Sequence, residues 1–198
     1  MTNTTMTTSY LEIVVGPMYS GKTSYLVEQY KKYKYIGKNV ICLNYVDDIR
    51  YGSEELSTHD LIKIPCIFVN QLSDIWSNPS HPNYSDIRNC DIILINEGQF
   101  FADLKSVVLD MIERCDGSQK SVYISGLDGD YCRGTFGQIL DLIPFCDQVT
   151  KKTALCANCH DGTPAPFTHR IIKSTEQIVI GTDIYMPLCR KCYLCMTK

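Results

Sequence analysis

The fold of this chain is decided by the stretch Leu-Glu-Ile-Val-Val-Gly-Pro-Met-Tyr-Ser-Gly-Lys-Thr at residues 11–23. The apolar, β-branched run at 11–15 predicts a strand that stops at Gly16. Residues 16–23 match the pattern GxxxxGK[ST], and apolar residues at helical spacing follow them. A strand before and a helix after are the context of a phosphate-binding loop, which a chance glycine-rich turn would lack. The chain is therefore predicted to bind a nucleoside triphosphate.

The residue types of this loop suit phosphate chemistry. Glycines let backbone N–H groups curl around phosphate oxygens, and the N-terminus of the following helix adds positive potential. We expect Lys22 against the outer phosphates and the Thr23 hydroxyl on Mg²⁺. The predicted nucleotide-binding residues of the loop are Gly16, Pro17, Met18, Tyr19, Ser20, Gly21, Lys22 and Thr23.

Composition limits the class of protein. The 198 residues are 44% hydrophobic and 21% charged, which suits one domain, or one domain with a small appendage. The net charge of −3 gives no global basic field, so nucleic acid is not an expected partner. The Thr-rich residues 1–9 lack the charged and apolar regions of a signal peptide and predict a loose tail. No apolar run reaches membrane-spanning length, so no membrane partner is expected.

Apolar segments alternate along the first 150 residues in a way that predicts an α/β fold. The strand–helix–strand pattern over residues 11–43 is typical of a right-handed βαβ unit with a parallel sheet. Strands are predicted at residues 11–15, 40–43, 66–69, 91–95 and 122–124. Helices are predicted after the phosphate loop as far as Gly37, at 104–112 and, as a short last helix, at 137–143. The expected architecture is a phosphate-loop parallel sheet flanked by helices.

The strongest buried-strand signal, at residues 91–95, ends in Asn96 and Glu97. Ligands of open α/β sheets lie at the carboxyl ends of the strands, where the phosphate loop also lies. An aspartate is the usual residue at the position of Asn96, which keeps an acceptor oxygen but lacks the charge. Glu97 is then the only carboxylate at this strand end, and we assign it as the general base. The alternative is a solvated glutamate that caps the strand.

Four of the eleven cysteines have the spacing of a metal site. They form two CxxC pairs, Cys156 with Cys159 and Cys189 with Cys192. Two such pairs favour a closed structural Zn²⁺ site. The alternatives are a redox disulfide, which usually needs one CxxC beside a βαβ unit, and unrelated buried thiols. A complete Cys₄ set leaves the neighbouring His160 and Cys195 as spectators.

The cysteines also mark a division of the chain. Alternating strands and helices give way to paired cysteines near residue 150, which predicts a tail at 1–9, a nucleotide-binding domain at 10–150 and a zinc lobe at 151–198. The other seven cysteines are most simply reduced thiols of a non-secreted protein. A cytoplasmic location is therefore expected.

Together these segments resemble one family, the cellular, zinc-containing (type II) thymidine kinases. The resemblance runs in order from Leu11 to Tyr193, and chance does not explain it. The segments that carry it are the phosphate loop at 16–23, Asp-Asp-Ile-Arg-Tyr at 47–51, Ser-Thr-His-Asp at 57–60, Asn-Glu-Gly-Gln-Phe-Phe at 96–101, the run at 127–137, Val-Ile-Gly at 179–181, Asp183, Tyr185 and the four paired cysteines.

The resemblance implies a kinase that transfers the γ-phosphoryl group of ATP to the 5′-hydroxyl of thymidine, giving dTMP for nucleotide salvage and DNA synthesis. On the ATP side it implies Asp48, Arg50, Asn96 and Gln99 in addition to the phosphate loop. On the thymidine side, under a lasso loop of the zinc lobe, it implies Met18, Phe100, Leu127, Tyr131, Phe136, Thr168, Gln177, Ile178, Val179, Ile180, Gly181 and Tyr185. Family members form homotetramers and are inhibited by dTTP, so both properties are expected here.

Two other functions fit the sequence less well. A nucleic-acid-stimulated NTPase would need motor motifs or a basic groove, and the sequence carries neither. A zinc-ribbon interaction module with a vestigial nucleotide site would not need Lys22, Thr23 and Glu97 to be intact. The kinase remains the favoured hypothesis.

Overall fold

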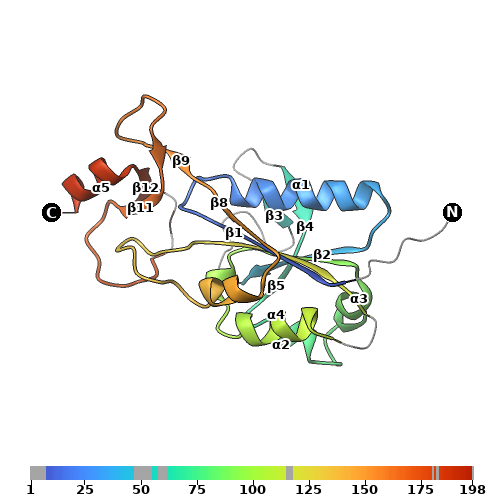
Figure 1. Ribbon diagram of the computed structural model, residues 1–198. Helices are drawn as coiled ribbons and strands as arrows, with labels where there is room; N and C mark the ends of the chain where they lie inside the picture. The colour runs from blue at the N-terminus through green and yellow to red at the C-terminus, as the bar shows by residue number, and fades with distance from the viewer. Residues whose placement is uncertain are drawn as a thin grey trace.

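The computed structural model describes residues 8–46, 55–57, 62–114, 118–179, 181 and 183–197. Its main body is a sheet with the strand order β5-β2-β6-β7-β1-β8, in which every neighbouring pair is parallel. These strands are β1 (Tyr10–Val15), β2 (Val40–Tyr45), β5 (Ile67–Val69), β6 (Ile92–Ile95), β7 (Ser121–Gly126) and β8 (Gln148–Lys151). The predicted α/β architecture with a parallel sheet is confirmed (Figure 1).

Helices cover both faces of the sheet (Figure 1). Helix α1 (Lys22–Tyr35) lies on one face, together with the short antiparallel pair β3 (Glu55–Ser57) and β4 (Lys63–Pro65). The other face carries α2 (Ser73–Trp76), α3 (Tyr84–Asn89), α4 (Leu104–Ile112) and the 3₁₀ helix η2 (Ile139–Phe145).

The central strand β6 shows why the sheet needs cover on both faces. Ile92 and Leu94 pack in the cluster under α1, whereas Ile93 and Ile95 pack in the cluster under α2, α3 and α4. All four side chains are fully buried. A strand buried on both faces reads as a continuous apolar run, which is how this segment appears in the sequence.

Helix α1 ends where the sequence predicts. Gly37 follows its last turn with φ +80°, a left-handed conformation that glycine adopts without steric cost. The Gly37 N–H donates to Lys34 O and the Lys38 N–H donates to Tyr33 O, so two of the last carbonyls of the helix are satisfied.

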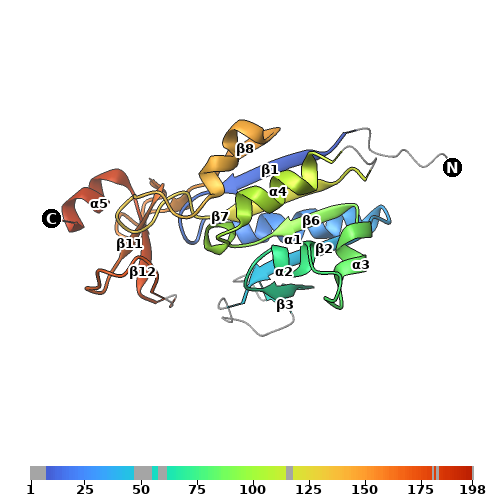
Figure 2. The same ribbon diagram turned by 90° about the horizontal axis from the view of Figure 1, so that it is seen from below.

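The C-terminal part of the chain forms a small lobe of its own secondary structure. It contains the pair β9 (Ala154–Leu155) and β10 (Pro164–Ala165), the pair β11 (Phe167–Arg170) and β12 (Tyr185–Leu188), and helix α5 (Arg190–Met196). Figure 2 shows this lobe next to the carboxyl end of β1, on the side of the molecule away from the N-terminus. The lobe is therefore placed at the end of the sheet where the phosphate loop begins.

Several elements differ from the prediction. The structure adds β8, the β3–β4 pair, α2 and α3, which the sequence analysis does not predict. The short helix expected at 137–143 is the 3₁₀ helix η2, which contains Pro144. Lys151 is the last residue of the main sheet. The division of the chain into separate domains near residue 150 stays a prediction.

Candidate active site

The phosphate loop follows β1 and depends on two glycines. Gly16 has φ +153°, and a Cβ at this position would lie 2.4 Å from Lys152 O. Gly21 has φ +75° and forms the N-cap of α1. At Gly16 the Lys152 carbonyl leaves no room for a side chain, and at Gly21 the left-handed backbone conformation favours glycine. The loop thus presents the N-terminus of a 14-residue helix to the cavity.

Lys22 extends across the loop that precedes it. Its Nζ donates a 2.7 Å hydrogen bond to Pro17 O, and the Ser20 hydroxyl donates to the same carbonyl at 2.8 Å. Lys22 is only 8% exposed, yet it lines the cavity at the carboxyl end of the sheet. A lysine held inside a glycine-rich loop can neutralise the charge of bound phosphates.

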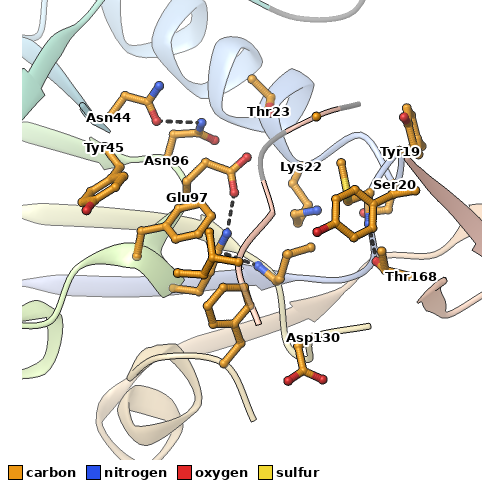
Figure 3. A pocket seen from close by; sticks show the side chains of 18 of the residues that line it. Tyr19, Ser20, Lys22, Thr23, Asn44, Tyr45, Asn96, Glu97, Asp130 and Thr168 are labelled. Carbon is orange, nitrogen blue, oxygen red and sulfur yellow. Dashed lines mark hydrogen bonds between the residues drawn. The ribbon is translucent and has the colours of Figure 1, made fainter. Parts of the chain in front are cut away.

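Asn96, at the end of β6, is fixed by two neighbouring strands. Its amide donates to Asn44 Oδ1 at 3.1 Å, and its carbonyl oxygen accepts from the Ser125 hydroxyl at 2.9 Å. It is 2% exposed and lines the same cavity as Thr23 and Glu97 (Figure 3). Oxygen ligands gathered at one strand end suit Mg²⁺.

Glu97 has an unusual backbone conformation. Its φ of 52° and ψ of 43° place it in the left-handed region, which residues other than glycine seldom occupy. The Gln99 side chain donates a 2.6 Å hydrogen bond to Glu97 Oε2 and accepts one of 2.9 Å from the Leu127 N–H. Strained residues held by surrounding contacts are concentrated at functional sites. The backbone conformation of Glu97 and the hydrogen bond from Gln99 together orient this carboxylate toward the cavity (Figure 3).

Aromatic side chains form one wall of the cavity. Phe100 stacks on Tyr45 with ring centroids 5.3 Å apart and meets Phe136 edge-on at 5.4 Å. All three line the cavity. Aromatic side chains in the same cavity as a phosphate loop suit the binding of a planar base.

The C-terminal lobe closes the opposite side. The Met18 N–H of the phosphate loop donates a 3.0 Å hydrogen bond to Thr168 Oγ1 on β11. Residues 171–179 then return over the cavity, where the Tyr185 hydroxyl donates to Val179 O at 2.9 Å and Gln177 Nε2 donates to Asp130 Oδ2 at 2.8 Å. The phosphate loop and the lobe therefore share one cavity.

Most of the predicted site residues line this cavity. They are Met18, Tyr19, Ser20, Gly21, Lys22, Thr23, Asn96, Glu97, Gln99, Phe100, Leu127, Tyr131, Phe136, Thr168, Gln177, Ile178, Val179, Gly181 and Tyr185. Gly16 and Pro17 are not among the lining residues, and they shape the loop from behind. Asp48, Arg50 and Ile180 lie outside the described residues, so their predicted roles stay predictions.

The cavity also has lining residues that the sequence analysis does not assign to a site. They are Ser24, Asn44, Tyr45, Glu55, Leu56, Ser57, Gly129 and Asp130. Arg170, which matches a motif of the resembled family together with Thr168, also lines the cavity. Asn44 and Tyr45 end β2, so the rule that ligands gather at the carboxyl ends of parallel strands could have found them. Glu55, Leu56 and Ser57 follow no such signal, because a three-residue strand in an irregular segment places them.

The four paired cysteines converge in the lobe. The Sγ atoms of Cys156, Cys159, Cys189 and Cys192 all lie within 4.8 Å of one another. Burial by itself raises the pKa of the Cys156 thiol. Hydrogen bonds from the backbone N–H groups of Cys189, Asn158 and Cys159 outweigh this effect and lower the pKa from 9.0 to about 6. Four sulfur donors at this separation fit a tetrahedral structural zinc ion. His160 and Cys195 are exposed and do not belong to this group.

Comparisons of the sequence with known proteins point to one family. The sequence profile of the family described as thymidine kinase matches residues 9–193. A thymidine kinase of Oryza sativa subsp. japonica is 40% identical over 186 residues, which are 93% of this chain and 66% of the rice protein. Thymidine kinase a of Arabidopsis thaliana is 39% identical over 93% of this chain and 74% of its own length. A thymidine kinase of Yaba monkey tumor virus is 38% identical over 93% of this chain and 94% of its own.

The protein is an α/β protein of the phosphate-loop type, because its sheet is parallel and a phosphate loop follows the first strand. It also carries a small lobe with four clustered cysteines. The chain belongs to the thymidine kinase family. Among the described residues, no helix is both long enough and apolar enough to span a membrane.

Proposed function

We propose that this chain is a thymidine kinase that transfers the γ-phosphoryl group of ATP to the 5′-hydroxyl of thymidine and releases dTMP and ADP. The observation that carries this proposal is the position of Glu97, which lines the same cavity as Lys22 and Thr23. Transfer to a hydroxyl needs phosphate-binding groups and a proton acceptor in one place. Membership of the thymidine kinase family supports thymidine as the acceptor.

The proposed reaction divides the work among a few residues. Lys22 and the loop amides bind the outer phosphates, and Thr23 and Asn96 offer oxygens to Mg²⁺, which when bound neutralises phosphate charge. Glu97 accepts the proton as the 5′-oxygen forms its bond to the γ-phosphorus and the bond from that phosphorus to the bridging oxygen of ADP breaks. The hydrogen bond from Gln99 to Glu97 Oε2 orients the carboxylate for this role.

The nucleoside would lie between the aromatic wall and the C-terminal lobe. Phe100 and Phe136 supply apolar surface, and Met18 and Leu127 border the same space. Residues 177–179 line the cavity, and their backbone would offer hydrogen-bonding groups to the edge of a base. The four lobe cysteines would hold a structural zinc, which when bound keeps this part of the site folded.

We also propose a cellular setting for this activity. None of the ten described cysteines forms a disulfide, which supports a reducing compartment such as the cytoplasm. Thymidine phosphorylation there would serve nucleotide salvage. A homotetrameric assembly and inhibition by dTTP are supported by the family resemblance. Light scattering and a dTTP titration of the purified protein test these two properties.

The test of the proposed function is a nucleoside panel. The protein is incubated with ATP, Mg²⁺ and, separately, thymidine, deoxyuridine, deoxycytidine, deoxyadenosine or deoxyguanosine, and nucleoside monophosphate and ADP are quantified by chromatography. We expect dTMP and ADP in equal amounts, and neither with a Lys22→Ala variant. ADP formed without any nucleoside monophosphate would favour an NTPase with a zinc ribbon that acts in nucleic-acid or protein interaction. No ADP with any nucleoside would reject both.

A further inference from the structure

Arg170 is a buried cation at the base of the segment that closes the cavity. It is the last residue of β11 and is 5% exposed. One terminal nitrogen of its guanidinium donates to Ser174 O and Glu176 O, and the other donates to Gln177 O at 2.8 Å and to the Tyr185 hydroxyl at 3.0 Å. One side chain thus binds three backbone carbonyl groups of the segment 174–177.

Two tyrosines complete this arrangement. The guanidinium carbon lies 3.7 Å from the ring centroid of Tyr131 and 5.3 Å from that of Tyr185. The Tyr131 hydroxyl donates to Ser174 O at 3.2 Å, and the Tyr185 hydroxyl donates to Val179 O at 2.9 Å. Arg170 and the two rings therefore hold the same stretch of backbone, residues 174–179, from several directions.

Stability alone is a poor explanation for this arginine. Within the described residues no carboxylate forms an ion pair with Arg170, and its Nε has no hydrogen-bond partner. Burial of a cation without a counter-charge costs free energy that neutral acceptors and ring faces offset only in part. A costly residue whose bonds all go to one loop is better explained by the shape of that loop.

We infer that Arg170 is a positioning residue, which fixes residues 174–179 in the closed shape that binds the nucleoside. This inference rests on the proposed function, since it assigns to the loop a role in nucleoside affinity. Arg170 acts through the loop backbone and not on the transferred phosphoryl group. The planar fork of a guanidinium can serve several carbonyls at once, whereas a lysine ammonium is a single point of attachment.

The variants Arg170→Lys and Arg170→Gln test the inference. Loss of hydrogen bonds from a charged group typically costs about 10- to 100-fold in an equilibrium. We expect the KM for thymidine to rise by about that factor in both variants, with kcat at saturating thymidine and the KM for ATP changed by less than about threefold. Lys173→Gln is the matched control, because it removes an exposed positive charge from the same loop and should leave all three constants unchanged.

Amide hydrogen exchange gives a readout independent of activity. Peptides that cover residues 171–179 should exchange faster in both Arg170 variants than in the wild type or Lys173→Gln, while peptides from β1 and β6 stay unchanged. If the wild-type protein makes no dTMP, the proposed function fails, yet the exchange comparison still tests whether Arg170 holds the loop.

Three results would overturn the inference. The first is unchanged exchange of the loop in both Arg170 variants. The second is a loss of kcat with an unchanged KM for thymidine, which would place Arg170 in the transfer step.

Should neither Arg170 variant fold, Tyr185→Phe provides a second test, because it removes the hydroxyl that bonds to Arg170 and Val179. An unchanged KM for thymidine and unchanged loop exchange in that variant is the third contradictory result.

Discussion

The side-chain amide of Gln99 donates a 2.6 Å hydrogen bond to Glu97 Oε2 while its oxygen accepts from the Leu127 N–H at 2.9 Å. A Cβ at Gly126 would lie 2.4 Å from Gln99 Oε1, and one at Gly137 would lie 2.1 Å from Gln99 O. Two glycines thus make room for Gln99, which is 3% exposed. The carboxylate that we assign as the base is oriented by a residue that is itself tightly packed.

Gln99→Met should therefore impair catalysis. The variant keeps the approximate size of the side chain but loses the hydrogen bond that orients Glu97. Because a bond to a charged group is worth ~1.5–3 kcal/mol, kcat should fall by about 10- to 100-fold. The KM for ATP, measured in the same assay, tests separately the ATP-side role that the family resemblance implies for Gln99. Gln148→Met, at an exposed glutamine of β8, is the control, and equal kcat values for the two variants would reject the role of Gln99.

Asn96→Asp should lower the Mg²⁺ concentration that gives half the maximal rate. A carboxylate attracts the cation and its bound waters, which a carboxamide does only as a dipole. The Ser125 hydroxyl can still donate to the new side chain, so its placement at the strand end is retained. A Mg²⁺ titration at saturating ATP and thymidine measures the effect. An unchanged or higher requirement would show that this position does not help to hold the ion.

Cys192→Ser should lose zinc, whereas Cys195→Ser should keep it. Cys192 belongs to the buried four-sulfur group, and Cys195 lies one turn later on α5 with an exposed side chain. Removal of one ligand from a structural site couples loss of metal to loss of local folding. We expect a higher KM for thymidine and aggregation in Cys192→Ser. Zinc per chain, measured by atomic emission, decides the matter, and stoichiometric zinc with full activity in Cys192→Ser would contradict the account.

The protein should lose stability between pH 10 and pH 12 because of a buried carboxylate with tyrosine partners. Tyr25 and Tyr10 donate to Glu12, which is 3% exposed, at 2.6 and 3.0 Å. Burial, followed by the bond to Glu12, raises the pKa of Tyr10 from 10.0 to about 12 and raises that of Tyr25 as well. Above pH 10 the unfolded chain releases tyrosine protons that the folded protein retains, so the free energy of unfolding falls as the pH rises.

Urea unfolding at pH 8 and pH 11 measures this dependence. Tyr25→Phe should be less stable than the wild type at pH 8 by about 1–2 kcal/mol and should lose less stability on going to pH 11. Tyr35→Phe is the control, because Tyr35 is 92% exposed. The same loss of stability in wild type and Tyr25→Phe would show that this tyrosine does not carry the effect.

The sequence predicts those parts of the fold whose signals are local. β1 and β6 are contiguous apolar runs, and the phosphate loop is a local motif, so their positions follow from pattern alone. β8 escapes prediction because it is an edge strand, mostly exposed, whose pairing is decided by β1. The four cysteines are found by spacing, since tetrahedral zinc sites recur with that spacing.

Contacts between distant segments are the part of the site that the sequence does not reveal. The bond from Gln177 to Asp130 joins residues 47 positions apart, and neither residue type has a periodic signal. The bonds from Arg170 to the loop need the turn of residues 171–177 to be known first. Such placements depend on tertiary packing, which composition and periodicity do not encode.

The most direct test of the central claim is the rate of phosphoryl transfer in Glu97→Gln. The substitution keeps the shape of the side chain and removes the proton acceptor, and the amide can still interact with Gln99. General-base contributions are ~10²–10⁴-fold, so we predict that kcat with saturating thymidine, ATP and Mg²⁺ falls by about that factor, while ATP affinity changes little. A near-normal kcat in Glu97→Gln would contradict the account, because the base would then have to be another residue.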